Sequence, residues 1–299
     1  MIIDIRPTVD LAFRLMLGSP EHSSVTVHFL NSVLRYEPRI RQVTILNPAL
    51  EKEAVDDELS ILDVKAQDES GRFFNIEMQT SLAGSLQKRL PYYLARLYCS
   101  QMREGMPYRQ LSPAVSICVL SKSLFPEHPQ SHFDFRLRDE WGMVFTDELQ
   151  LHLIELPKST TDVHNVRDAS LLERWSFLLR RAHEIDVDEL HQLLPEPEFH
   201  EALGVLEMIT HTPETRELYE ARLKAQLDEE ARLYDARPEG LTQGRVEGKL
   251  IGKIQVLEGL LRVPHTDPSL LESWNEAQLA ARCKELEQRI SATENWPTV

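Results

Sequence analysis

The chain has few cysteines and lacks the features that mark secreted or membrane proteins. Only Cys99, Cys118 and Cys283 occur among the 299 residues, and none belongs to a CxxC pair. A disulfide framework and a thiolate zinc site are therefore not expected. No apolar run approaches the roughly 18 residues of a membrane-spanning helix, and the first residues contain no basic segment followed by an apolar one. We therefore expect a soluble, cytoplasmic protein without a membrane partner or an export signal.

Several common catalytic motifs are also absent. The sequence contains no GxxxxGK[ST], no GxGxxG after a predicted strand, no HExxH and no GxSxG. These absences argue against P-loop, dinucleotide-binding, zincin and α/β-hydrolase chemistry. Ser85 and Lys88 fit SxxK, but neither SDN nor KTG accompanies them, and so short a motif occurs by chance. The 11 histidines form no ligand-spaced pair on a strong helix, which argues against a histidine metal site.

The composition that is present is that of a globular protein. Hydrophobic residues make up 42% and charged residues 27% of the chain, which excludes wholesale disorder. The 33 basic and 48 acidic residues give a net charge of -15. Because this sign is wrong for coating nucleic acid with the whole surface, any nucleic-acid contact must be local.

Hydrophobic periodicity predicts a mixed α/β structure in the first half of the chain. Apolar positions at helical spacing predict helices over residues 8–17, 22–34 and 86–103. Alternating and β-branched residues predict strands over residues 39–46, 59–66, 72–79, 111–120 and 149–156. The turn-rich residues 68–71 predict that the second and third strands form a hairpin. This order is typical of a mixed sheet with helices on its faces.

The second half of the chain is predicted to be almost entirely helical. A polar connector follows Pro157, so we expect one domain over residues 1–158, a helical region over residues 159–236 and a glycine-repeat and helical tail over residues 237–299. A narrow apolar stripe before the tail suits a partner helix and suggests a homo-oligomer formed through the C-terminal helices. Four glycines spaced by four residues make the start of the tail either a marginal helix held by a neighbour or a flexible tether.

The predicted hairpin carries the residues that point to chemistry. On its last strand the even-numbered positions are apolar, whereas Asn75, Glu77 and Gln79 share the other face. Asp63 and Lys65 share one face of the preceding strand. If these faces match across the turn, Asp63 and Glu77 lie close together, with Lys65 and Gln79 beside them.

Two neighbouring carboxylates at a partly buried place favour a hard divalent cation. Magnesium typically takes one or two protein carboxylates and leaves its other positions to water and phosphate oxygens. The chemistry implied is hydrolysis of a phosphodiester. The same pattern is also typical of a plain cross-strand ion pair of Lys65 with Asp63 and Glu77 on a solvated face.

The order of these motifs resembles the Rpn family of recombination-promoting nucleases or putative transposases, a branch of the PD-(D/E)XK nuclease superfamily. Asp63 followed by Asn-Ile-Glu-Met-Gln at residues 75–79 is similar to the D…ExQ variant of the superfamily motif. Asp10 opens a segment similar to the family's D-x-x-F-[KR], and residues 89–98 match R-x-x-Y-Y-x-x-x-x-Y. The likeness extends over residues 8–255.

The resemblance implies a restriction-endonuclease-like α/β fold and a magnesium-dependent DNA endonuclease of low sequence specificity, linked to recombination or mobile elements, in which Mn²⁺ can substitute. Asp63, Glu77 and the main-chain carbonyl of Met78 would hold the metal. Gln79 stands where the superfamily usually has lysine, and a neutral amide can only offer hydrogen bonds and no positive charge. Either the site is slower or another cation substitutes, for which Lys65 is the candidate.

A local basic surface is predicted on the helix after the hairpin. Arg89, Arg96 and Arg103 recur every seven residues beside Lys88, and we expect these four residues to bind DNA phosphates. The same spacing is typical of a solvated helix face. Asp10 is expected as an auxiliary carboxylate, although an acid at a helix start is also favoured by the helix dipole.

The alternative to an active endonuclease is a catalytically weak or inactive nuclease-fold module that binds DNA or a protein partner.

Overall fold

The computed structural model describes residues 1–46, 64–82 and 84–291. The chain divides into two compact units, Met1–Gln226 and Leu227–Val299. Asp63 and the first part of the strand predicted over residues 59–66 lie outside the described residues.

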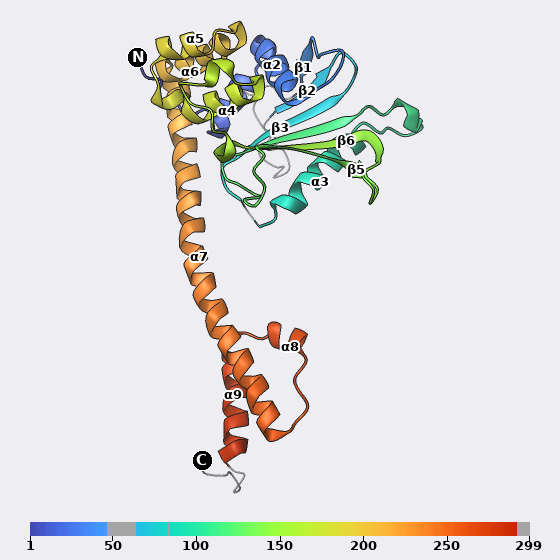
Figure 1. The fold of residues 1–299 in the computed structure, drawn as a ribbon, viewed down its shortest axis with the longest axis vertical. Coiled ribbons are helices and arrows are strands. Elements are labelled where there is room, and N and C mark those ends of the chain that lie inside the picture. Colours follow the sequence, from blue (N-terminus) through green and yellow to red (C-terminus); the bar gives the residue numbers. More distant parts are fainter. Residues whose placement is uncertain (47–63, 83, 292–299) are drawn as a thin grey trace. The chain divides into compact units, whose positions relative to one another are not determined.

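The first unit is built on a mixed sheet that has six strands in the described residues, in the order β1-β2-β3-β4-β6-β5 (Figure 1). The strands are β1 (Val43–Ile45), β2 (Val64–Asp68), β3 (Phe73–Gln79), β4 (Ala114–Leu120), β5 (His132–Arg138) and β6 (Val144–Glu155). β3, β4 and β6 are parallel, and the other neighbours are antiparallel. The sheet confirms the predicted restriction-endonuclease-like fold class. The hairpin is also confirmed, and Gly71 at its turn adopts a φ of 87°, which favours glycine.

Helices cover both faces of this sheet (Figure 1). On one face, apolar side chains of alternate sheet positions, including Phe74 and Ile76, form one large core with helices of this unit other than α3. On the opposite face, α3 packs on the sheet through Leu90 and Leu94. The helices of this unit are α1 (Asp10–Leu17), α2 (Ser23–Val33), α3 (Leu86–Cys99), α4 (Leu171–Arg181), α5 (Val187–Leu193), α6 (Pro197–His211) and the first part of α7 (Pro213–Leu261). Because β4 is covered on both faces, it is buried at every position and is apolar except for Ser116.

The helices that follow the polar connector share the core of the sheet. Trp175 of α4 is fully buried, and its ring centroid lies 5.5 Å from that of Phe29 and 4.7 Å from that of Phe199. The composition change near residue 158 therefore marks the end of the sheet, whereas the division into compact units falls after Gln226. These helices belong to the first unit because the apolar faces of α4 and α6 are buried against α1 and α2.

Several elements differ from the predicted boundaries, among them β6, which begins at Val144 and not at residue 149. α3 ends at Cys99 and not at residue 103, because the side chain of Gln101 hydrogen-bonds both the main-chain nitrogen and the main-chain oxygen of Ser112, at 2.9 and 2.8 Å. These bonds draw the chain towards β4. Strand β5 was not predicted, although its alternation of polar and apolar residues is typical of a strand; it lies at the edge of the sheet and pairs with β6.

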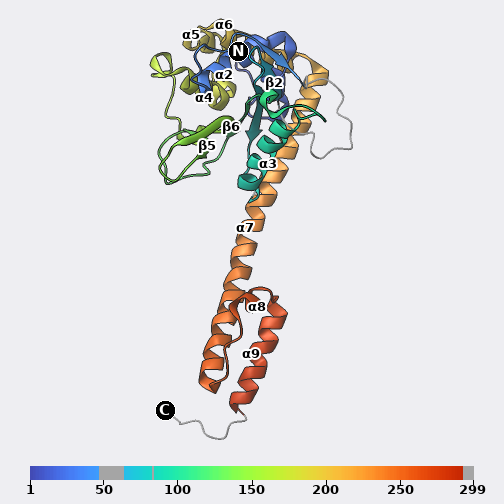
Figure 2. The ribbon, with the colours of Figure 1, turned by 90° about the vertical axis from the view of Figure 1, so that its right-hand side faces the viewer.

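The second unit contains the last part of α7 together with α8 (Pro268–Glu272) and α9 (Glu276–Ser291). Ile254 of α7 is buried against Leu279 and Leu286 of α9, and Figure 2 shows these helices side by side. The glycine repeat is helical. Of the two predicted forms, a helix and a flexible tether, the structure shows the helix. A Cβ added at Gly248 or Gly252 would meet nothing within 4 Å, so close packing does not require these glycines. Among the described helices, none is long and apolar enough to cross a membrane.

Candidate functional site

The predicted polar face of the hairpin exists and is covered by α3. Glu77 and Asn75 of β3 are only 2% and 1% exposed, and Gln79 at the end of the strand is half-buried. Lys65 of β2 pairs with Asn75 in the strand register, so its side chain shares this face. The structure thus brings together four of the predicted polar side chains. Asp63, the fifth, lies outside the described residues and directly precedes β2 in the sequence.

Within the described ranges, Glu77 is a buried carboxylate without a cation in contact. Its Oε1 accepts a hydrogen bond of 2.5 Å from Asn75 Nδ2, and no described lysine, arginine or histidine nitrogen forms an ion pair with it. Burial raises the pKa of Glu77, whereas the bond from Asn75 and the positive charge of Arg89 act in the opposite direction. A charge in this environment needs a cation or a proton.

Two further oxygen atoms at this place lack hydrogen-bond partners among the described residues. They are Asn75 Oδ1 and Ser116 Oγ, which are both buried. Ser116 of β4 pairs with Asn75 in the parallel register, so the two side chains lie on the same face. Oxygen atoms of carboxylate, amide and hydroxyl groups are the donors that hard divalent cations prefer. The donor set around Glu77 therefore fits magnesium or manganese.

Lys65 is the positively charged residue of this face, and it follows the predicted metal ligand Asp63 by two residues in the sequence. Its side chain is half-buried, and burial followed by the positive charge of Arg96 lowers the pKa of Lys65. The loss of a proton is therefore easier for this ammonium group than for an exposed lysine. This property suits a group that exchanges a proton with water near a reacting phosphate.

The basic residues of α3 lie along the helix that covers this face. Arg89 is half-buried, with its guanidinium carbon 5.7 Å from the ring centroid of Tyr93, while Lys88 and Arg96 are exposed. The prediction that Arg103 continues this helical row is wrong, because α3 ends at Cys99. Arg103 is exposed in the turn that follows.

Asp10 and the side chain of Met78 belong to other surroundings. Asp10 Oδ2 lies 3.5 Å from Arg222 Nη1 of α7, and its Oδ1 accepts the main-chain N–H of Leu11 at 2.7 Å. α1 packs on the sheet face opposite to α3, so the structure does not bring Asp10 to Glu77. The Met78 side chain is buried in that opposite core, and only its main-chain carbonyl remains a candidate ligand. In the described ranges, which do not include Asp63, no cluster of three or more His, Cys, Asp or Glu residues suits a metal.

Sequence reasoning missed the parts of the site that depend on neighbouring strands and helices. The bond from Asn75 to Glu77 had a local signal, since residues two apart in a strand share a face. Ser116 had none, because its place beside Asn75 depends on the parallel pairing of β3 with β4. The action of Arg89 on Glu77 likewise depends on how α3 packs over the sheet.

Comparison with known proteins agrees with this geometry. A family model described as PD-(D/E)XK nuclease family transposase matches residues 7–236, which include the hairpin and α3. No curated protein and no solved structure matches the chain. Since the match spans most of the chain, the predicted resemblance is confirmed, and the chain belongs to the PD-(D/E)XK nuclease family transposases.

Proposed function

We propose that this protein is a divalent-metal-dependent DNA endonuclease that hydrolyses phosphodiester bonds with low sequence specificity during recombination or the movement of mobile elements. Membership of a nuclease family supports the proposal. The single structural observation that carries it is Glu77, a buried carboxylate with no cation in contact among the described residues, at the position of the family's metal-binding acid.

In this proposal Asp63, Glu77 and the main-chain carbonyl of Met78 hold Mg²⁺, for which Mn²⁺ can substitute. Such an ion supplies an activated water and offsets the charge that develops on the phosphodiester. Asn75 holds Oε1 of Glu77 in place through its 2.5 Å hydrogen bond. It is a positioning residue, because it acts through the carboxylate.

The remaining side chains act on the water and on the phosphate. Gln79 orients the water through its amide, which can donate and accept hydrogen bonds. Lys65, as an ammonium group, supplies the charge that a lysine in place of Gln79 would bring, and its lowered pKa makes the loss of a proton from Nζ easier. Lys88, Arg89 and Arg96 of α3, with Arg103 after it, contact backbone phosphates and carry no base specificity.

Nicking of supercoiled plasmid DNA in the presence of magnesium or manganese tests this function. Asp63→Asn and Glu77→Gln should each lower the cleavage rate by about a hundredfold or more, because each removes one charged ligand. Glu127→Gln is the matched control, since Glu127 is exposed and lies outside the site. Circular dichroism checks that the variants remain folded. Absence of cleavage by the wild-type protein with either ion contradicts the proposal.

Gln79→Lys is a sharper test of the departure from the family motif. The added ammonium should keep or raise the cleavage rate, because it can polarise water and offset phosphate charge. A folded variant without activity would mean that the amide of Gln79 has a specific role of its own.

The second candidate is a nuclease fold that binds DNA or a protein partner without cleaving. Gln79 in place of lysine and the net charge of -15 favour it. Calorimetric titration with magnesium separates the two, because the non-catalytic module predicts no ion binding that depends on Glu77.

We also propose self-association through the C-terminal helices, where Val256 and Leu260 of α7 are 63% and 49% exposed. Sedimentation of the full chain measures this self-association.

A further inference from the structure

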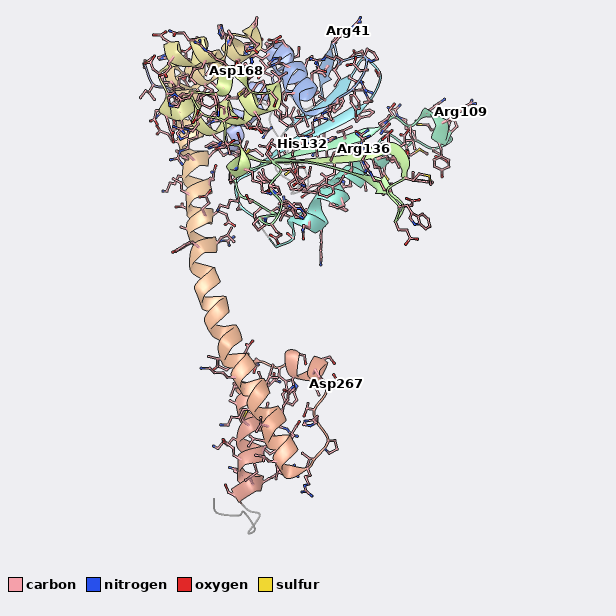
Figure 3. All side chains as sticks on the ribbon, in the orientation of Figure 1. Arg41, Arg109, His132, Arg136, Asp168 and Asp267 are labelled. Atoms are coloured by element: carbon pink, nitrogen blue, oxygen red, sulfur yellow. The ribbon has the colours of Figure 1, made fainter. Side chains whose placement is uncertain are left out.

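A second polar cluster lies on the sheet face opposite to α3, where the proposed cleavage reaction does not use it. His132, Asp134 and Arg136 alternate along β5 and therefore share one face, and Figure 3 shows His132 and Arg136 along this strand. His152 of β6 is the register partner of Asp134. With Arg35, which follows α2, these residues line a cavity of about 280 Å³.

The two histidines contact each other, and the buried Nε2 of His152 lacks a hydrogen-bond partner among the described residues. His132 Nε2 and His152 Nδ1 are 3.0 Å apart. The side chain of His152 is 3% exposed, and its Nε2 forms no hydrogen bond with the part of the chain that the structure describes. The nearest carboxylate oxygen, Asp134 Oδ1, is 3.9 Å away, which is too far for a hydrogen bond.

The position of Asp134 indicates which nitrogen of His152 carries the proton. Burial lowers the pKa of both His132 and His152, so both rings are neutral at pH 7. If His152 donated through Nδ1, its bare Nε2 would face the Asp134 oxygen, acceptor against acceptor. The favoured arrangement has His132 donating through Nε2, so that His152 carries its proton on the unpartnered Nε2. The cavity wall therefore presents a buried donor without an acceptor.

Two arginines make the lining positive in an otherwise acidic protein. Arg136 Nε donates to Asp134 at 2.9 Å and Nη1 donates to Asp147, and its Nη2 donates to no other described residue. Arg35 is exposed, forms no hydrogen bond or ion pair with the described residues, and lies close enough to His132 to lower its pKa. Asp134 is the one carboxylate of the lining and is held by Arg136.

We propose that this cavity binds a dianionic phosphate group, either free phosphate or a terminal phosphate monoester of a nucleotide or a DNA end. Two guanidinium groups and a neutral N–H donor match its oxygen acceptors. The cavity is several times the roughly 30 Å³ that one water occupies in the liquid, which leaves room for the anion. A metal ion fits less well, because the facing nitrogens of the two histidines bond each other and the described part of the chain contains no three-residue metal cluster.

Calorimetric titration of the full chain with inorganic phosphate tests the proposal. Arg35→Gln should weaken binding by about tenfold or more, because a charge-assisted hydrogen bond is lost. Arg39→Gln is the matched control, since Arg39 is exposed on the same connection between α2 and β1 but does not line the cavity; its binding should change by less than about twofold. NMR of the imidazole nitrogens should show a shift at His152 Nε2 on addition of phosphate.

The source of the phosphate is distinguished by parallel titrations with a 5′-mononucleotide and with a DNA hairpin that carries either a 5′-phosphate or a 5′-hydroxyl. Binding of phosphate alone assigns the free anion, and binding of the phosphorylated but not the hydroxyl hairpin assigns a DNA end. No saturable binding of any phosphate compound at millimolar concentration, or equal weakening by Arg35→Gln and Arg39→Gln, overturns the proposal. Glu77→Gln should bind phosphate like the wild type, because Glu77 does not line the cavity. The phosphate proposal is therefore tested independently of the nuclease proposal.

Discussion

A neutral side chain at position 77 should make the metal-free protein more stable. Glu77 is 2% exposed, accepts one hydrogen bond from a neutral amide and has no ion pair with the described residues. Glutamine has nearly the same shape, and its Oε1 can still accept the N–H of Asn75. Glu77→Gln therefore removes the buried charge while the packing and the hydrogen bond remain.

The size of the effect follows from desolvation. A buried polar group that lacks compensation costs about 1 to 3 kcal/mol in protein mutational data, so the variant should gain this order of unfolding free energy near neutral pH. Because burial raises the pKa of Glu77 above its ordinary value of 4.5, the native state binds this proton more tightly than the unfolded state. The contribution of Glu77 to wild-type stability therefore falls as pH rises from 4.5 through the native pKa of this group. The difference between the two proteins should vanish below that interval.

Urea unfolding with EDTA at about pH 7.5 and about pH 4 measures this difference. In thermal unfolding, a gain of this size corresponds to a melting temperature raised by about 2 to 12 °C. Glu127→Gln, an exposed control, should stay within about 0.5 kcal/mol of the wild type. Added magnesium should stabilise the wild type and not Glu77→Gln. A Glu77→Gln protein less stable than the wild type in EDTA at neutral pH would refute the reasoning.

Two further predictions concern parts of the fold away from the site. Burial lowers the pKa of His152 to about 4 from 6.5, so the contribution of His152 to stability should be fully present above pH 6.5 and decrease by up to about 3 kcal/mol as pH drops to about 4. In urea unfolding over this range, His152→Gln should lose most of that dependence and the exposed His164→Gln should keep it; equal slopes in both would contradict the explanation. Tyr219→Phe should cost about 1 to 2 kcal/mol in thermal unfolding, because the Tyr219 hydroxyl accepts the main-chain N–H of Arg6 at 2.8 Å; an unchanged melting temperature would show that water replaces this bond.

The sequence by itself determined the hairpin and the family. The turn at residues 68–71 and the alternation of apolar and polar positions after it lie within one short segment, so local pattern was enough to predict β2 and β3 and to place Asn75, Glu77 and Gln79 on one face. The order of the motifs was enough to predict the nuclease family, which the family model confirms.

Only the tertiary structure decided how buried that face is and what surrounds it. The parallel pairing of β3 with β4 sets Ser116 beside Asn75, and the packing of α3 brings the charge of Arg89 to Glu77. Strand β5 and its cavity depend on pairing with β6 and on the approach of the segment after α2. The reason is physical: periodicity fixes which face a side chain takes, whereas desolvation and charge interactions depend on atoms that are distant along the chain.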